Sequence, residues 1–310
     1  MNSTDFRRRV LRGLAANRTP GFHFAGNFLG VSYDRVASDG ARISLEAGPH
    51  CIDSRGEMDL GAVAMLADIA LATSIRCAID SDRARLATVS MHLQFTGAAI
   101  TGKLEAFGEF QGFLAGTAAR QGVSRVALDA NGTRVGFGSG AFMALEPPAG
   151  VTMHPVVPER PREAAPLDES RLEPGEAAIL RHADEVLARI KSTSSLIEAF
   201  WGFEAHRTES GGAATLKNGG HVSNRVGHVQ GGLLVGLSAK TAMAALPATW
   251  MLASVSACFV SPGEGESLHA SSKVIHHGRD TAVVRTEVTG VDGRKVLQTM
   301  STHARRPATA

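Results

Sequence analysis

The segment Leu60–Ile75 (LGAVAMLADIALATSI) most constrains the fold of this chain, because it is apolar or small on nearly every face. It is long enough for a helix but short of the roughly 20 apolar residues that span a bilayer. Other elements must wrap a helix that is apolar all round, so the sequence predicts a buried central helix. Its one charged residue, Asp68, is costly to ionise there unless it is hydrogen-bonded, paired or used in chemistry. A structural carboxylate satisfied by backbone groups is the alternative to a functional one.

The composition is that of a globular protein with room for two domains. The 310 residues are 44% hydrophobic and 20% charged, and 32 Lys and Arg against 30 Asp and Glu leave a net charge of +2. That balance argues against a nucleic-acid partner or a membrane surface. Cys51, Cys77 and Cys258 lack metal-ligand spacing, which predicts reduced thiols, no metal site and a cytoplasmic protein.

Alternation of apolar and polar residues predicts strands on both sides of the central helix. Before it come an amphipathic helix, with Phe6, Val10 and Leu14 four residues apart, and a strand over Ala41–Ala47. The strands predicted after it are Thr88–Phe95, Lys103–Phe110, Val123–Leu128 and Thr133–Leu145.

Glycines mark two features of the last two strands. Asn131-Gly132 between them is a strong hairpin signal. Gly136, Gly138 and Gly140 share one face of Thr133–Leu145 and leave it bare, so another group can approach closely and the binding pocket has room there.

The same order of elements recurs after a segment rich in Pro, Glu and Arg. That segment, 147–173, predicts a linker between domains at 1–146 and 174–310. His50 and Gly56 are six residues apart, as are His221 and Gly227. The elements predicted in the second half are helices around Ile179–Ile190 and Gly231–Leu246, strands Met251–Val260, Ser267–His276, Ala282–Val291 and Lys295–His303, and a hairpin at Asp292-Gly293. We therefore predict two copies of one α+β unit, a helix wrapped by an antiparallel sheet.

The junction Asn224–Gly232 (NRVGHVQGG) resembles the N-x-x-G-x-x-H-G-G signature of the hotdog-fold acyl-CoA thioesterases, in particular the family of the phenylacetic-acid pathway thioesterase. Gln230 stands where that family usually has His. The resemblance covers both halves but not the linker. It implies a tandem double hotdog, with two antiparallel sheets that each wrap a central helix, packed as an intramolecular pseudo-dimer.

The family also implies a catalytic Asp nine residues after the His position, on the central helix. In the first half Asp59 occupies the His position and Asp68 is nine residues beyond it, whereas the second half has Ala239 there. Thr88 falls at the strand position where the family has a Ser or Thr near the carboxylate. The first half thus keeps the Asp but has an altered loop, and the second half keeps the loop but lacks the Asp.

Hotdog dimers of this type build each site from the loop and helix N-terminus of one subunit and the carboxylate of the other. The intact pieces, crossed between halves, therefore predict one complete site, and the pairing of Asp59 with Ala239 is expected to be inactive. The predicted catalytic residues are Asp68, Thr88, Asn224, Gln230 and Gly231, and the predicted substrate-binding residues are Gly227, Gly232, Arg279 and Arg294.

Thioester chemistry gives these residues their roles. Cleavage places negative charge on the carbonyl oxygen, and free N–H groups at a helix N-terminus such as that of Gly231 stabilise it. Asp68 would attack the thioester carbon or activate a water, while Asn224 and Gln230 orient the thioester. Asp59 at the matching place would set a charge roughly 4 Å from the oxyanion, a repulsion of about 4 kcal/mol at an effective dielectric of ~20. That repulsion corresponds to about a thousandfold loss of rate.

Other polar residues give weaker signals. Arg279 and Arg294 lie near predicted turns, where they could meet the phosphates of coenzyme A. His276 and His277 are adjacent in a strand and point to opposite faces, so they do not predict a shared metal. Lys240 lies about 100° round the second central helix from the carboxylate face and is predicted at a helix end or interface.

The sequence therefore predicts an acyl-CoA thioester hydrolase that needs no cofactor beyond the coenzyme A of its substrate. Two alternatives stay open. The chain could be a non-catalytic acyl-CoA-binding or scaffold protein, if the altered loops mean that both halves have lost activity. It could also be a hotdog hydratase or dehydratase, although no His accompanies Asp68 at suitable spacing. The acyl chain stays undefined, and pseudo-dimers of this fold can associate further.

Overall fold

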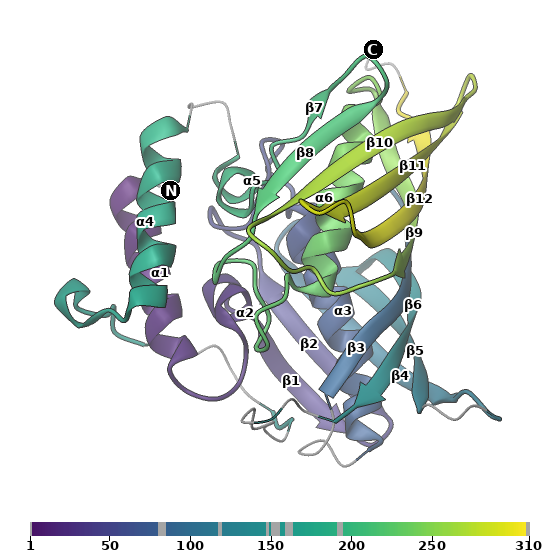
Figure 1. Ribbon diagram of the computed structural model, residues 1–310. Helices are drawn as coiled ribbons and strands as arrows, with labels where there is room; N and C mark the ends of the chain where they lie inside the picture. The colour runs from purple at the N-terminus through teal and green to yellow at the C-terminus, as the bar shows by residue number, and fades with distance from the viewer. Residues whose placement is uncertain are drawn as a thin grey trace.

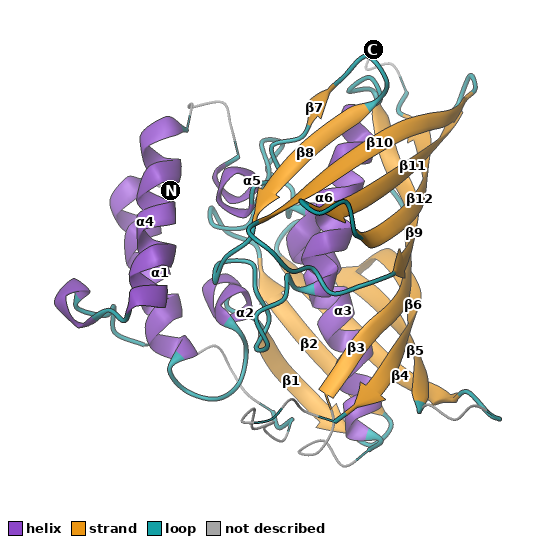
Figure 2. Ribbon diagram, viewed as in Figure 1, coloured by secondary structure: helices purple, strands orange, loops and turns teal. Residues whose placement is uncertain are grey.

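The computed structural model describes residues 2–79, 85–116, 120–146, 149, 156–158, 164–190 and 195–307. Its strands form one antiparallel 12-stranded sheet in the order β1-β2-β4-β5-β6-β3-β9-β12-β11-β10-β8-β7 (Figures 1 and 2). The first six come from the N-terminal half, and the last six repeat that arrangement in reverse. The strands are β1 Ser32–Ala37, β2 Gly40–Glu46, β3 Arg85–Phe95, β4 Lys103–Phe113, β5 Gln121–Ala130, β6 Thr133–Leu145, β7 His206–Arg207, β8 Gly212–Lys217, β9 Trp250–Phe259, β10 Ser267–His277, β11 Thr281–Gly290 and β12 Lys295–Arg305.

Each half of the sheet curves around one central helix (Figure 2). The helices are α1 Ser3–Asn17, α2 Phe24–Leu29, α3 Leu60–Cys77, α4 Pro174–Arg189, α5 Leu196–Trp201 and α6 Gly231–Ala244. By length and composition α3 could cross a membrane, yet 72% of it is buried inside the protein. The predicted buried helix is confirmed, and α6 is its counterpart in the second half.

The two central helices pack against each other around a local twofold axis. A Cβ added to Gly232 would lie 2.4 Å from the Cα of Met65, and one added to Gly236 would lie 2.5 Å from the Cα of Gly61. An offset of 171 residues relates Gly61 to Gly232 and Met65 to Gly236, so these are the same contact made twice. The central pairing of β3 with β9 continues the sheet across the same axis.

The loops that precede α3 and α6 have matching geometry. The Asp53 N–H donates to the Glu57 carbonyl and the Asn224 N–H donates to the His228 carbonyl, both at 2.7 Å. Gly56 and Gly227 adopt φ values of +78° and +86°, which favour glycine because they bring Cβ atoms of other residues into collision. The spacing that predicted the repeat therefore reflects one loop built twice.

The predicted elements are largely confirmed. In α1, Phe6, Val10 and Leu14 are fully buried, and the Asn131-Gly132 hairpin has φ values of +47° and +77°. The short strands β1, β7 and β8 were not predicted. Much of the predicted linker 147–173 lies outside the described residues. After the linker, α4 lies beside α1 (Figure 1), and the two helices are joined by an ion pair between Arg7 and Asp184.

The prediction that the glycine face of β6 adds room to the binding pocket was wrong. A Cβ on Gly138 would lie 2.1 Å from the His92 carbonyl oxygen, and one on Gly140 would lie 3.1 Å from Leu71 Cδ1. The glycines instead let the backbone of β3 and the side of α3 approach the strand. Close approach was predicted correctly, but the approaching group is the protein itself.

Candidate active site

Asp68 lies in the middle of α3, and groups from both halves of the chain hold its carboxylate. Thr88 in β3 donates its hydroxyl to Oδ1 at 3.1 Å, and Gln230 Nε2 donates to Oδ2 at 2.6 Å. The backbone N–H of Gly232 in α6 donates to it as well. The structure thus brings a first-half acid to the N-terminus of the second-half helix.

Burial raises the pKa of Asp68 to about 6. Only 7% of the residue is exposed, and loss of water disfavours the charged form. The hydrogen bonds from Thr88, Gly232 and Gln230 act in the opposite direction, since they stabilise the carboxylate. The carboxyl therefore titrates close to neutral pH, where a general base or nucleophile works best.

Gln230 has its amide orientation fixed by the helix it caps. Its Oε1 accepts the N–H of Leu233 at 2.9 Å, and a backbone N–H can only donate. The amide nitrogen must therefore face Asp68. Glutamine in the usual histidine position thus links the helix terminus to the acid without being able to titrate.

Gly231 is the first residue of α6, and its N–H has no acceptor among the residues described. A Cβ added to Gly231 would lie 3.1 Å from Thr88 Oγ1 and 3.3 Å from Asp68 Oδ2. The backbone of α6 therefore passes directly over the acid. Asp68, Thr88, Gln230 and Gly231 line one cavity of about 510 Å³, a size typical of ligand pockets.

We expect Gly231→Val to close this cavity. Its branched side chain would enter the space between Thr88, Asp68 and Phe259. KM for a substrate that reacts at Asp68 should therefore rise, and kcat/KM should fall by about 100-fold or more. Steady-state kinetics measures the change, and thermal unfolding shows whether the fold is kept. A folded Gly231→Val variant with unchanged kinetics would contradict this placement.

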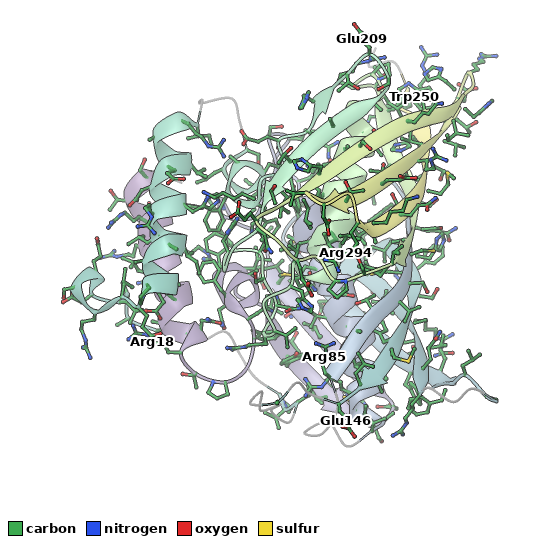
Figure 3. All side chains as sticks on the ribbon, viewed as in Figure 1. Arg18, Arg85, Glu146, Glu209, Trp250 and Arg294 are labelled. Atoms are coloured by element: carbon green, nitrogen blue, oxygen red, sulfur yellow. The ribbon has the colours of Figure 1, made fainter. Side chains whose placement is uncertain are left out.

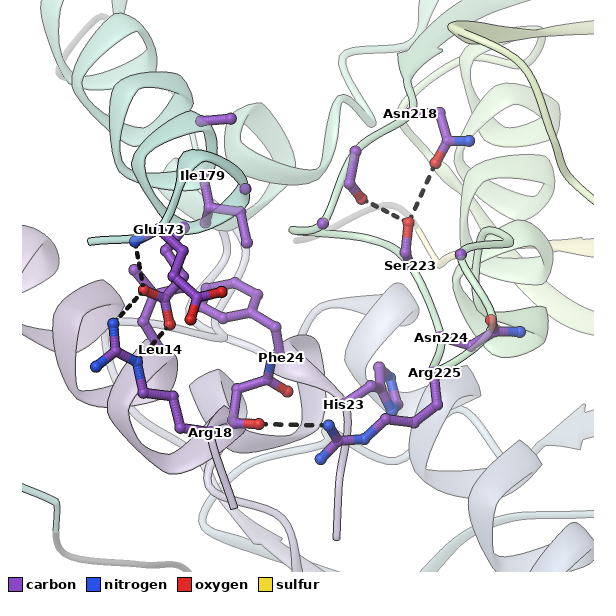
Figure 4. A pocket seen from close by; sticks show the side chains of 17 residues that line it. Leu14, Arg18, His23, Phe24, Glu173, Ile179, Asn218, Ser223, Asn224 and Arg225 are labelled. Carbon is purple, nitrogen blue, oxygen red and sulfur yellow. Dashed lines mark hydrogen bonds and ion pairs between the residues drawn. The ribbon is translucent and has the colours of Figure 1, made fainter. Parts of the chain in front are cut away.

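Asn224 shapes the loop before α6. Its Oδ1 accepts the N–H groups of Val226 at 3.0 Å and His228 at 3.1 Å, so this oxygen is occupied. The residue borders the cavity at Asp68 and also a second cavity of about 930 Å³, which α1, α4 and the loop enclose (Figure 4). Gly227 lines only the second cavity. His23, Asn224 and Arg225 line both.

The two predicted phosphate-binding arginines lie apart. Arg294 donates to the carbonyl of Pro262, a residue at the rim of the Asp68 cavity, and lies near Glu264 (Figure 3). Arg279 is in the β10–β11 turn, next to His277, whose ring contacts Trp250 at the start of β9. The cavity is at the other end of β9, ~30 Å along the strand, so the prediction that Arg279 joins the site was wrong.

The opposite pseudo-site is filled by side chains. Asp59 caps α3 by accepting the Gly61 N–H at 2.8 Å, and Lys240 Nζ lies 3.1 Å from its Oδ2. Phe203 and Trp201 cover Gly61 so closely that a Cβ there would lie 2.4 Å and 2.9 Å from their rings. Lys240 is thus an interface residue, as predicted, and pairs with a carboxylate of the other half.

Sequence reasoning missed the arginines of the cavity. Arg76 and Arg85 line it at the end remote from α6, and Arg225 enters it from the loop. Arg225 donates to the carbonyl of Phe22, which ties this loop to the segment before α2. No pattern marked these residues, because strand and helix ends rich in Arg are common on protein surfaces.

No group of potential metal ligands occurs in the part of the chain that the structure describes.

Comparison with known proteins supports the fold. Residues 221–304 match the family model described as the acyl-CoA thioesterase N-terminal domain. A tesB protein of Mycobacterium avium subspecies paratuberculosis has a similar structure, with a TM-score of 0.54 at 14% identity over 89% of this chain and 96% of that one. No curated protein matches the sequence.

A second solved structure, a conserved protein of unknown function with a hot dog fold from Alicyclobacillus acidocaldarius, gives a TM-score of 0.55 at 10% identity. It covers 93% of this chain and 100% of that one. This chain is therefore a double hotdog protein. Its resemblance to the hotdog-fold acyl-CoA thioesterases, predicted from sequence, is confirmed.

Proposed function

We propose that the protein hydrolyses acyl-CoA thioesters at a single composite site between its halves. The observation that carries this proposal is the contact of Asp68 with the N-terminus of α6, where Gln230 and Gly232 hold the acid and the Gly231 N–H has no described acceptor. An acid and a preorganised donor then face one cavity from opposite halves. Acyl transfer needs both groups.

In the proposed reaction the thioester carbonyl oxygen accepts the Gly231 N–H at the positive end of α6. The ionised Asp68 either attacks the carbonyl carbon or takes a proton from a water that attacks it. In both routes the carbon–sulfur bond breaks, water supplies the hydroxyl of the product acid, and coenzyme A leaves as the thiol. Thr88 and Gln230 keep Asp68 in position throughout.

We propose the second cavity as the path of the coenzyme A arm. It is wide, and both polar and apolar residues line it (Figure 4). His23, Asn224 and Arg225 line this cavity and the first one. Arg294 donates to the carbonyl of Pro262, which lines the first cavity, so it would act on the bound ester through that loop. The arm would thus run between the loop and α1, while the acyl group enters the apolar cavity along α3.

The pH profile tests the role of Asp68. Both routes need the carboxylate, so kcat/KM should rise with pH and level off above an apparent pKa of about 6. Thr88→Val removes a hydrogen bond that lowers the pKa of Asp68, so in this variant the midpoint should move to higher pH. A profile that is flat from pH 4.5 to 8 would contradict the proposal.

A panel of acyl-CoA esters, assayed for release of the free thiol, tests the activity itself. We expect turnover that is lost on mutation of Asp68. Binding of these esters without hydrolysis by the wild-type protein would favour the non-catalytic alternative. Hydration of an enoyl-CoA would instead favour a hydratase.

A further inference from the structure

The cavity at Asp68 extends along α3 toward its C-terminus. Asp68, Ile69, Ala72, Thr73 and Arg76 line it, and their spacing is that of one helical face. Arg76 is eight residues beyond the acid, ~12 Å along the helix axis. Helical side chains lean toward the N-terminus, so Arg76 leans back toward Asp68.

Strand β3 brings a second arginine to the same end. Thr88 contacts Asp68, and the residues before it, Arg85, Leu86 and Ala87, also line the cavity. Arg85 lies ~10 Å along the strand from Thr88. Because β3 returns from the C-terminus of α3, Arg85 and Arg76 mark one end of the cavity (Figure 3 labels Arg85).

Arg85 differs from the third arginine of the cavity in its partners. Arg225 donates to backbone carbonyls, including that of Phe22. Arg85 Nε is buried, and none of the described residues accepts a hydrogen bond from it. A buried Nε–H without an acceptor is costly, so this end of the cavity is suited to an anionic oxygen group from a ligand.

The wall between Asp68 and the arginines is mainly apolar. Ile69, Ala72, Leu86, Phe142 and Leu145 contribute to it. Methylene groups gain by contact with such a surface, whereas the amides of the pantetheine arm would lose hydrogen bonds to water. A hydrocarbon chain is therefore the segment best suited to join a thioester at Asp68 to an anionic group at the arginines.

Building on the proposed hydrolase activity, we propose that the preferred substrates are coenzyme A monoesters of dicarboxylic acids. The thioester lies at Asp68 and the Gly231 N–H, the methylene chain follows α3, and the free carboxylate binds Arg85 with Arg76 beside it. A phosphate of coenzyme A carries the same anionic oxygens, so the test must separate the two sources.

Adipyl-CoA and hexanoyl-CoA form the matched pair for this test, because they differ only in the terminal carboxylate. We expect the wild-type protein to favour adipyl-CoA in kcat/KM by about 10- to 100-fold. Arg85→Met should remove most of this preference, and Arg85→Lys should keep part of it. Arg125→Met is the control, because Arg125 is exposed on β5 and pairs with Glu109 there; it should leave the preference unchanged.

Two outcomes would overturn the proposal. A wild-type protein without preference for adipyl-CoA would show that no carboxylate is recognised. If Arg85→Met lowered kcat/KM equally for adipyl-CoA and hexanoyl-CoA, Arg85 would instead be assigned to a phosphate of coenzyme A.

Binding to the Asp68→Asn variant separates this inference from the proposed activity. Calorimetry should show tighter binding of adipyl-CoA than of hexanoyl-CoA, and Arg85→Met added to the variant should abolish the difference. That result supports the carboxylate site even if the wild-type protein hydrolyses neither ester. Equal binding of the two esters would overturn it.

Discussion

Replacing Asp68 with Asn should lower kcat/KM for acyl-CoA hydrolysis by about a thousandfold or more, equivalent to about 4 kcal/mol of transition-state stabilisation. Asparagine can neither attack the thioester nor accept a proton from water, although it keeps the size of the side chain. The loss should appear in kcat, because the bound substrate still meets the Gly231 N–H. Steady-state and single-turnover kinetics on the same ester measure it.

Asp59→Asn is the matched control, because Asp59 caps the other central helix at the filled pseudo-site. Activity should stay within a few-fold of wild type. Both variants should unfold cooperatively, which excludes a loss of structure as the cause. Equal activity in the wild type and both variants would defeat the assignment of the site.

Lys240→Met should lower the free energy of unfolding by about 3–5 kcal/mol, the cost of leaving a buried charge without its partner. Lys240 lies between Asp59, which is fully buried, and Glu198, which is largely buried. Burial alone would lower the pKa of Lys240, but the charges of Asp59 and Glu198 outweigh burial and raise it. Its ammonium is therefore charged and holds α6, α3 and α5 together.

Urea unfolding measures this effect, and two variants control for it. Adding Asp59→Asn to Lys240→Met should restore part of the stability, since it removes the uncompensated charge. Lys295→Met removes an exposed lysine near Glu287 and should change stability little. If Lys240→Met were as stable as Lys295→Met, the filled pseudo-site would not depend on this ion pair.

The fold was predictable because its strongest signals are local. α3 is apolar on every face and needs a wrapping sheet, and alternation located most strands within a few residues of their ends. The composite arrangement followed from the resemblance, since neither half carries both the acid and the glycine-lined loop. The strand β8, Gly212–Lys217, was missed because small residues blur its alternation.

The sequence could not predict the features of the site that depend on which ends of distant helices and strands lie together in the fold. Arg279 and Arg85 both lie next to turns or element ends, yet one is ~30 Å along the sheet from the site and the other lines it. The three partners of Lys240 come from two distant segments of the chain, the loop before α3 and α5. The glycines on one face of β6 indicated from sequence that another group approaches closely, but they could not indicate that this group is the backbone of β3.

A crystal structure of the Asp68→Asn variant with an uncleaved acyl-CoA tests the composite site most directly. We expect one ligand per chain, with the thioester carbonyl oxygen accepting the Gly231 N–H and its carbon facing residue 68. A thioester bound instead at the N-terminus of α3, beside Asp59 and Gly61, would contradict a single site shared between the halves.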